Sequence, residues 1–402
     1  MSYLRREQLG SSLLLLGLTF GWCVSAVFGI GTNVLTRVIM LLSVAPFLKG
    51  INYVHNTNLK IRYLILFVYQ ITITLLAVYF DKKEDLIYNL YLIAVISVLM
   101  LTASNDRDLW KNNHVFFVMG VFIVVSFFII NTLGKENLYD RTGIGYSNNY
   151  PVIATSMLIF LFYSLTFYQY KFRFLYLGVN LLLSVLVMMN IFSLVSRTAI
   201  LGFLLGILLF LLKRSSDKFK KRFLICAIII GIMTIILIPS FRNAFESIID
   251  IFTRGLKSFI GVDGNSNIEM SASTRKKLRD EALTKISSEM HLKEFLFGFG
   301  YKDRYLDFPV LQIFMDLGFL GAVFYCTLFI LYPFYKIMRR RNWTFMDYIF
   351  IMNSLNFLTV GQPYDFVKLV PVIMWYSFSA CFKENRIEQK DSIYIRNQRP
   401  IN

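Results

Sequence analysis

The chain has 402 residues, of which 56% are hydrophobic and only 17% are charged, whereas soluble domains carry about 25% charged residues. This composition excludes a disordered chain, a collagen-like fibre and a disulfide-stapled secreted domain. The formal net charge of +17 belongs to basic residues that lie between long apolar runs, which is typical of an integral membrane protein. We therefore expect membrane lipids as partners and no nucleic acid.

Twelve apolar runs are candidates for membrane-spanning helices, because a bilayer core needs about 20 apolar residues per helix. The runs lie near residues 11–30, 33–50, 62–80, 86–103, 115–133, 151–168, 174–195, 198–212, 223–240, 308–335, 345–361 and 367–382. Since the runs at 33–50 and 367–382 are the weakest, ten or eleven spans are the alternative. The predicted fold is an all-α polytopic membrane protein, with residues 1–402 in a single membrane domain.

The positions of lysine and arginine predict the orientation of the chain, because cytoplasmic loops are enriched in both residues. Nearly all of the net positive charge falls in connections on the same side as the two termini, so both termini are expected in the cytoplasm. On the opposite side, the sequence predicts a short extracytoplasmic loop at 131–149 and a large one at 241–306. The cysteines and histidines are scattered and predict neither a disulfide framework nor a metal site.

The large loop is expected to be partly helical, with an amphipathic helix at about 271–290. At about 100° per residue, Arg275 and Arg279 share one face with the apolar side chain of Ala282. An arginine on a packing face needs an anionic partner, because an unpaired buried charge is strongly destabilising. Either a structural ion pair with Asp307 or Asp316, or an anionic ligand, meets that requirement.

Arg197 is a second unusual charge, since it follows Ser196 at the outer junction of two apolar runs. A charge at that depth is costly and is expected to face protein or a watery cavity. The alternative is that Arg197 extends its guanidinium to the lipid headgroups. Further along, Asp316 lies inside an apolar run beside Gly318 and Gly321, whose three-residue spacing favours close helix packing.

Several short motifs occur in an order that resembles the O-antigen polymerase and O-antigen ligase superfamily, whose members are polytopic membrane glycosyltransferases of the C-type architecture. The resemblance covers about half of the chain, from residue 141 to residue 321. The motifs are Arg141-Thr142-Gly143 with Asn148-Asn149, Ser196-Arg197, Arg275 with Ala282, Gly298-Phe299-Gly300, Leu311-Gln312-Ile313, and Asp316-Leu317-Gly318-Phe319-Leu320-Gly321. Ligases of this superfamily carry a His-Asn pair just before the Leu-Gln segment, where this chain has Asp307-Phe308, and the acidic residue favours a repeat-unit polymerase.

The resemblance implies a polymerase that joins undecaprenyl diphosphate-linked oligosaccharides into O-antigen, capsule or exopolysaccharide, at the outer face of the bacterial cytoplasmic membrane. It implies an inverting transfer that needs no metal or other cofactor, because arginines neutralise the leaving diphosphate. The residues expected to hold the diphosphate are Arg197, Arg275 and Arg279, and Asp307 is the expected general base. Further substrate contacts are expected from Arg141, Asn148 and Asn149. A chain-length regulator and a flippase are the expected protein partners.

Two other functions stay open. A ligase would transfer the finished glycan to another acceptor, such as a lipid A core. A flippase for the lipid-linked repeat units fits twelve spans and basic inner loops equally well. Transporters often contain repeated halves with broken helices at corresponding positions, and the sequence shows neither feature.

Overall fold

The computed structural model describes most of the chain between residues 57 and 359, with gaps. The described residues are 57–82, 113–131, 150–194, 196–212, 218–237, 270–302, 306, 308–340, 343–359 and 363–364, together with the isolated residues 12, 16, 86, 89, 90, 93, 94, 246, 249, 253, 369, 371, 372, 375 and 376. The expected spans at 11–30, 33–50, 86–103 and 367–382 lie mainly or entirely outside these ranges, as do both termini and the loop at 131–149.

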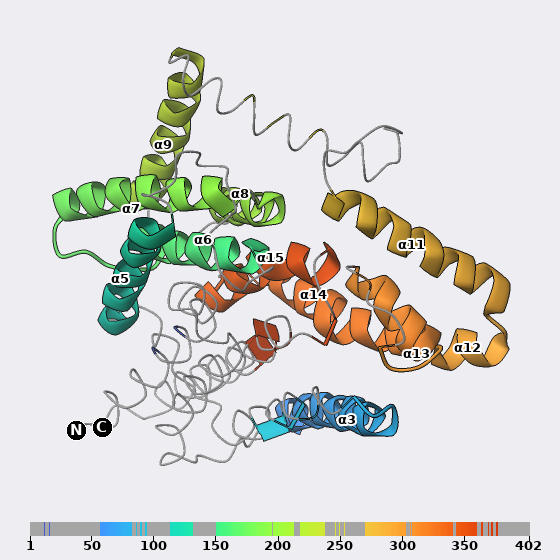
Figure 1. Ribbon diagram of the computed structural model, residues 1–402. Coiled ribbons are helices and arrows are strands. Elements are labelled where there is room, and N and C mark those ends of the chain that lie inside the picture. The colour runs from blue at the N-terminus through green and yellow to red at the C-terminus, as the bar shows by residue number, and fades with distance from the viewer. Residues whose placement is uncertain are drawn as a thin grey trace, which may run out of the picture. The chain divides into compact units, whose positions relative to one another are not determined.

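Every element in the described ranges is a helix, and no strand occurs among them (Figure 1). The helices are α3 (Thr57–Tyr79), α5 (His114–Asn131), α6 (Tyr150–Thr166), α7 (Arg173–Leu194), α8 (Arg197–Leu212), α9 (Lys218–Leu237), α11 (Met270–Glu289), α12 (Leu292–Phe297), α13 (Pro309–Tyr325), the π-helical segment η2 (Cys326–Leu331), α14 (Tyr332–Met338) and α15 (Phe345–Thr359). The protein is therefore all-α over the part of the chain that the structure describes.

Two of these helical stretches are long and apolar enough to cross a membrane, Arg173–Ile191 and Pro309–Met338. Four further apolar helices within the described ranges have 10–17 residues. Their composition suits a lipid environment, where a helix satisfies every backbone polar group internally. These six apolar stretches coincide with expected apolar runs, and the number of spans stays a prediction.

The chain divides into two compact units, of which the first comprises Met1–Gly206, Leu331–Leu355 and Tyr364–Asn402. Its centre is α6, whose residues from 152 to 166 are all buried, and α5 and α7 pack against it. The Phe116 ring makes T-shaped contacts with the rings of Phe160 and Tyr163, whose centroids lie 5.8 and 5.0 Å away. A helix that is apolar all round, as α6 is, is suited to this central position.

The start of α15, also in the first unit, is fixed by a buried carboxylate. Asp347 is fully buried and accepts hydrogen bonds from the amide and hydroxyl of Thr344, at 2.7 and 2.9 Å. The amide of Asp347 donates back to the Thr344 hydroxyl, at 3.3 Å, which makes a reciprocal capping box. The same carboxylate accepts from Arg340 at 2.9 Å and from the Trp375 indole at 2.8 Å. Asp347 therefore links three segments of this unit.

The second unit comprises Ile207–Ile330 and Asn356–Pro363. Within it, α12 packs along α13 (Figure 1). Ala282 of α11 forms a small apolar core with Leu306 and Met315, all at most 2% exposed. The side chains of Leu278, Ile286, Phe299 and Leu311 pack around that core. The face of α11 that carries Ala282 is therefore its packing face.

The stretch expected as one apolar run at 308–335 differs from a regular helix at one residue. α13 is broken at Gly318, whose backbone angles are φ 67° and ψ −166°. Beyond the break, the helical stretch continues through η2 and α14 to Met338. The sequence does not predict this break, because glycines are also common at sites of close helix packing.

Candidate functional site

Two glycines bring the end of α12 against the break in α13. Gly298 follows α12 with φ 81° and ψ 178°, and Gly318 lies in the break with φ 67°. A Cβ atom on Gly298 would overlap the backbone of Asp316 and Leu317, and one on Gly318 would overlap the backbone of Leu296 and Phe297. Only glycine combines a positive φ with such an approach of two backbones. The close approach of the two segments therefore depends on both glycines, although 20 positions separate them in the sequence.

Hydrogen bonds complete this contact. The Phe299 amide donates to the carbonyl of Met315 at 2.7 Å, and the Gly300 amide donates to the carbonyl of Asp316 at 3.2 Å. In a regular helix these two carbonyls would accept from residues one turn further on, which the break at Gly318 prevents. The Gly298-Phe299-Gly300 turn supplies substitute donors, so buried carbonyl groups are satisfied at the break.

A buried polar pair lies just before the break. Asp316 is 1% exposed and Gln312 is fully buried. The Gln312 amide nitrogen donates to Asp316 Oδ2 at 3.3 Å, and its amide oxygen accepts from the Leu306 backbone at 2.9 Å. Gln312 therefore links the Leu306 backbone to the buried carboxylate of Asp316. Leu306 is the residue that directly precedes Asp307.

Cationic side chains flank the packing face of α11. Arg279 has a side chain that is 31% exposed, and its guanidinium lies 3.4 Å from Asp280. Such a long, partly exposed ion pair contributes little to stability. The Lys285 ammonium lies 4.4 Å from the centre of the Phe299 ring, which is within range of a cation–π interaction. Positive charge is therefore present beside the Gly298-Phe299-Gly300 turn.

The structure places only some of the residues predicted for the site. Arg197 is the first residue of α8 and Arg275 lies in the second turn of α11, while their side chains lie outside what the structure describes. Arg141, Asn148, Asn149 and Asp307 all lie outside the described residues. Of the three predicted diphosphate ligands, only Arg279 has a side chain that the structure describes, and it lies in the second unit.

Two features of the site were missed from the sequence. Lys285 lies three residues after Ala282. Residues three apart are neighbours on a helix surface, so this spacing could have predicted that Lys285 lies beside the packing face. Gly321 was expected to permit close helix packing, but a Cβ atom there would overlap Leu317 of the same helix. The tight contact at Gly321 is thus within α13. In the described residues, no three His, Cys, Asp or Glu side chains gather to hold a metal ion.

Comparisons of the chain with protein-family models, with curated proteins and with solved structures gave no match. The resemblance of its motifs to the polymerase and ligase superfamily therefore stays an expectation.

Proposed function

We propose that this protein is a membrane glycosyltransferase that polymerises undecaprenyl diphosphate-linked oligosaccharide repeat units at the outer face of the bacterial cytoplasmic membrane. The proposal includes about twelve membrane spans, with both termini in the cytoplasm. The product would be a surface polysaccharide of the O-antigen, capsule or exopolysaccharide class.

The observation that supports this proposal most is the contact between two motifs of the resemblance. Gly298-Phe299-Gly300 and Asp316-Leu317-Gly318 are joined by the hydrogen bond from Gly300 to Asp316 and by two reciprocal glycine contacts, and the Phe299 amide donates to the adjacent Met315. Ala282, from a third motif, lies in the apolar core that includes Met315. Motifs that are far apart in the sequence thus meet at one place in the second unit.

In the proposed reaction, a hydroxyl oxygen of the incoming repeat unit attacks the anomeric carbon of the growing chain. The bond from that carbon to the diphosphate oxygen breaks, and undecaprenyl diphosphate leaves with the bonding electrons. Asp307 accepts the proton of the attacking hydroxyl, as a general base. Attack opposite the leaving group inverts the configuration of the anomeric carbon.

The leaving diphosphate gains negative charge as the bond breaks, and the proposed ligands are Arg197, Arg275 and Arg279. Planar guanidinium groups bind two phosphate oxygens at once and stay charged at every physiological pH. Arg141, Asn148 and Asn149 are proposed to contact the sugars or the second diphosphate. Lys285, whose ammonium lies 4.4 Å from the centre of the Phe299 ring, adds a cation beside the Gly298-Phe299-Gly300 turn.

The direct test is a polymerisation assay with lipid-linked repeat units and the purified full-length protein. We expect Arg197→Ala and Arg275→Ala each to lower the rate about 100-fold or more, as loss of a preorganised charge-stabilising donor does. Asp307→Asn is expected to lower it by about 100- to 10,000-fold. Arg222→Ala is the matched control, since Arg222 is exposed in α9 and is predicted to face the cytoplasm.

Wild-type rates in the Arg197 and Arg275 variants would remove both from diphosphate binding. An undiminished rate in Asp307→Asn would remove that residue from the base role. A chain that transfers preformed glycan to a lipid A core, and does not elongate it, is a ligase and contradicts the proposal.

The flippase alternative would use the break in α13, because unwound carbonyls in transporters coordinate ions. In this chain, the carbonyls of Met315 and Asp316 already accept the amides of Phe299 and Gly300. This pairing favours a structural role for the break. A null mutant distinguishes the functions, since loss of a polymerase leaves single repeat units exported, whereas loss of a flippase leaves them inside the cell.

A further inference from the structure

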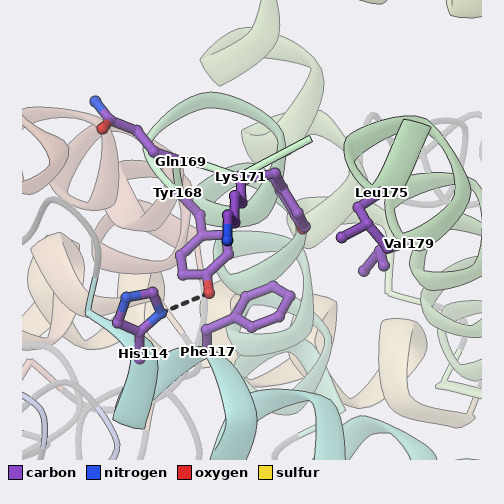
Figure 2. A pocket seen from close by; sticks show the side chains of 8 residues that line it. His114, Phe117, Tyr168, Gln169, Lys171, Leu175 and Val179 are labelled. Atoms are coloured by element: carbon purple, nitrogen blue, oxygen red, sulfur yellow. Dashed lines mark hydrogen bonds between the residues drawn. The ribbon is translucent and has the colours of Figure 1, made fainter. Parts of the chain in front are cut away.

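The first unit contains an open pocket of about 620 Å³ that the proposed glycosyl transfer does not use. It is formed where α5 begins and where α6 connects to α7 (Figure 2). Its lining combines aromatic, aliphatic and basic side chains, and no aspartate or glutamate is among them: His114, Phe117, Tyr168, Gln169, Tyr170, Lys171, Leu175 and Val179. Its volume is in the range of small-molecule sites, about 300–1,000 Å³.

The aromatic wall of this pocket is held by ring packing and a hydrogen bond. The rings of Phe117 and Tyr168 are stacked, with centroids 4.0 Å apart and planes at 8°. The Tyr168 hydroxyl lies 2.7 Å from His114 Nδ1, and Figure 2 shows this bond at the edge of the pocket. Stacking on Phe117 and the hydrogen bond with His114 therefore both fix the orientation of the Tyr168 ring.

A buried chain of hydrogen bonds fixes Tyr170. The hydroxyl of Ser164 donates to Asn180 at 2.7 Å, so its oxygen is left to accept from the Tyr170 hydroxyl at 2.6 Å. Asn180 in turn donates to the Tyr176 carbonyl at 2.8 Å. Burial raises the pKa of Tyr170 to about 12, so its hydroxyl stays protonated and keeps this bond. The connection between α6 and α7 thus has a preformed shape.

The pocket lies where an apolar helix surface ends and basic residues begin. α7 carries exposed apolar side chains along its length, including Phe174, Leu181 and Leu182, which are 68%, 68% and 60% exposed. Lys171 lies two residues before α7 and Arg173 is its first residue, and both are exposed. The Lys171 ammonium lies 5.4 Å from the centre of the Phe172 ring, and Figure 2 shows Leu175 and Val179 on the side of the pocket opposite His114 and Tyr168. Aromatic and basic residues at the end of an apolar helix are typical of headgroup depth in a bilayer.

We infer that this pocket binds the anionic headgroup of a phospholipid, with the Lys171 ammonium on the phosphate and Leu175 and Val179 against the first methylenes of an acyl chain. His114 lines the same side and offers its second ring nitrogen. A basic site between membrane helices on the cytoplasmic side attracts anionic lipids, because that leaflet is negatively charged. The inference rests on the membrane placement of α5 to α7 and not on glycosyl transfer.

The test is native mass spectrometry of the full-length protein, titrated with phosphatidylglycerol or with phosphatidylcholine. We expect a bound phosphatidylglycerol that Lys171→Gln weakens about fivefold, the effect of one basic residue near an anionic surface. Val179→Trp fills the pocket without changing charge and is expected to remove the same bound lipid. Lys218→Gln is the matched control, because Lys218 is exposed at the start of α9 and does not line the pocket.

Equal phosphatidylglycerol binding by the wild type, Lys171→Gln and Val179→Trp would overturn the inference, as would equal binding of the two lipids. A third titration uses glycerol 3-phosphate alone. Competition by that soluble anion at the lipid's own concentration would show a soluble-phosphate site and contradict a lipid site. Because the readout is lipid binding, a failure here leaves the polymerase proposal standing, and the reverse also holds.

Discussion

At the scale of single residues, Gln312 is a buried side chain that forms hydrogen bonds with two separate buried groups. Its fully buried amide holds a backbone N–H on one side and a buried carboxylate on the other. When a buried polar group loses its hydrogen-bond partner, its desolvation cost is no longer offset, and the folded state is destabilised by that amount. Gln312 therefore connects Leu306, in the segment before α13, with Asp316 through two buried hydrogen bonds.

Gln312→Leu removes both bonds and leaves the Leu306 amide and the Asp316 carboxylate without this partner. We expect the free energy of unfolding to fall by about 1–3 kcal/mol. Thermal unfolding of the purified protein in detergent measures this change. Gln169→Leu is the control, since Gln169 is exposed, and its midpoint is expected to stay near that of the wild type. An unchanged midpoint in Gln312→Leu would exclude the proposed connection.

At the scale of elements, the contact between α12 and α13 depends on two backbones that approach through glycine. The break in α13 and the turn after α12 match in their hydrogen bonds as well as in their shape. A side chain at either glycine would separate the two segments. Substitution of Gly298 or Gly318 by any residue with a side chain is therefore expected to disrupt this contact.

Gly318→Ala is expected to destabilise the protein by about 2 kcal/mol or more. A residue with a side chain at these backbone angles costs about 1–3 kcal/mol, and the added Cβ overlaps the backbone of Leu296 and Phe297. Gly178→Ala is the matched control, because Gly178 lies within α7 and a Cβ there meets nothing within 4 Å. The unfolding midpoint of Gly178→Ala is expected to be equal to or higher than that of the wild type. If both variants unfold alike, the glycine contact is not a source of stability.

Asp347 joins the start of α15 to Arg340 and Trp375, and its removal affects all three segments. Asp347→Ala leaves the Arg340 guanidinium and the Trp375 indole without the carboxylate that they share. We expect a loss of about 3–5 kcal/mol, as for other broken buried ion pairs. The unfolding midpoint and the quenching of tryptophan fluorescence measure this loss. Asp280→Ala, at an exposed position of α11, is expected to change stability by less than about 1 kcal/mol.

At the scale of the whole molecule, the distribution of charge predicts the orientation of the chain. The basic residues behind the net charge of +17 are predicted to lie in cytoplasmic loops, and the total carries no information about the substrate. The reactive residues are proposed on the opposite side, where positive and negative charges nearly balance. The proposed function therefore depends on a few basic side chains at particular positions and not on the net charge of the chain.

The orientation predicts which surface lysines are accessible from outside the cell. In a variant without the four native cysteines, Lys293→Cys, in the exposed start of α12, is expected to react with a membrane-impermeant maleimide on intact cells. Lys218→Cys, at the exposed start of α9, is expected to react only after the membrane is permeabilised. Labelling of both residues in permeabilised cells is the control. The reverse pattern would show that the orientation is wrong.

Sequence patterns predicted the helices better than they predicted the contacts between them. Long apolar runs sufficed for helices such as α6 and α7, because run length and composition are local properties. The break at Gly318 was missed, since the glycine spacing is the same in a packed helix and in a broken one, and the difference lies with Gly298, a distant residue. The pocket around Tyr168 was missed for the same reason, because three separate segments build it. The cap of α15 was within reach, since Thr344 and Asp347 have the spacing of a capping box.

The break at Gly318 also divides a 30-residue apolar stretch into two unequal lengths. The part after the break, to Met338, rises about 30 Å at 1.5 Å per residue, which equals the thickness of the hydrocarbon core. That part alone is sufficient to cross the bilayer. In the proposed topology, the part that contains Gln312 and Asp316 would then lie level with the outer headgroups, at the depth of the diphosphate of a membrane-embedded polyprenyl carrier.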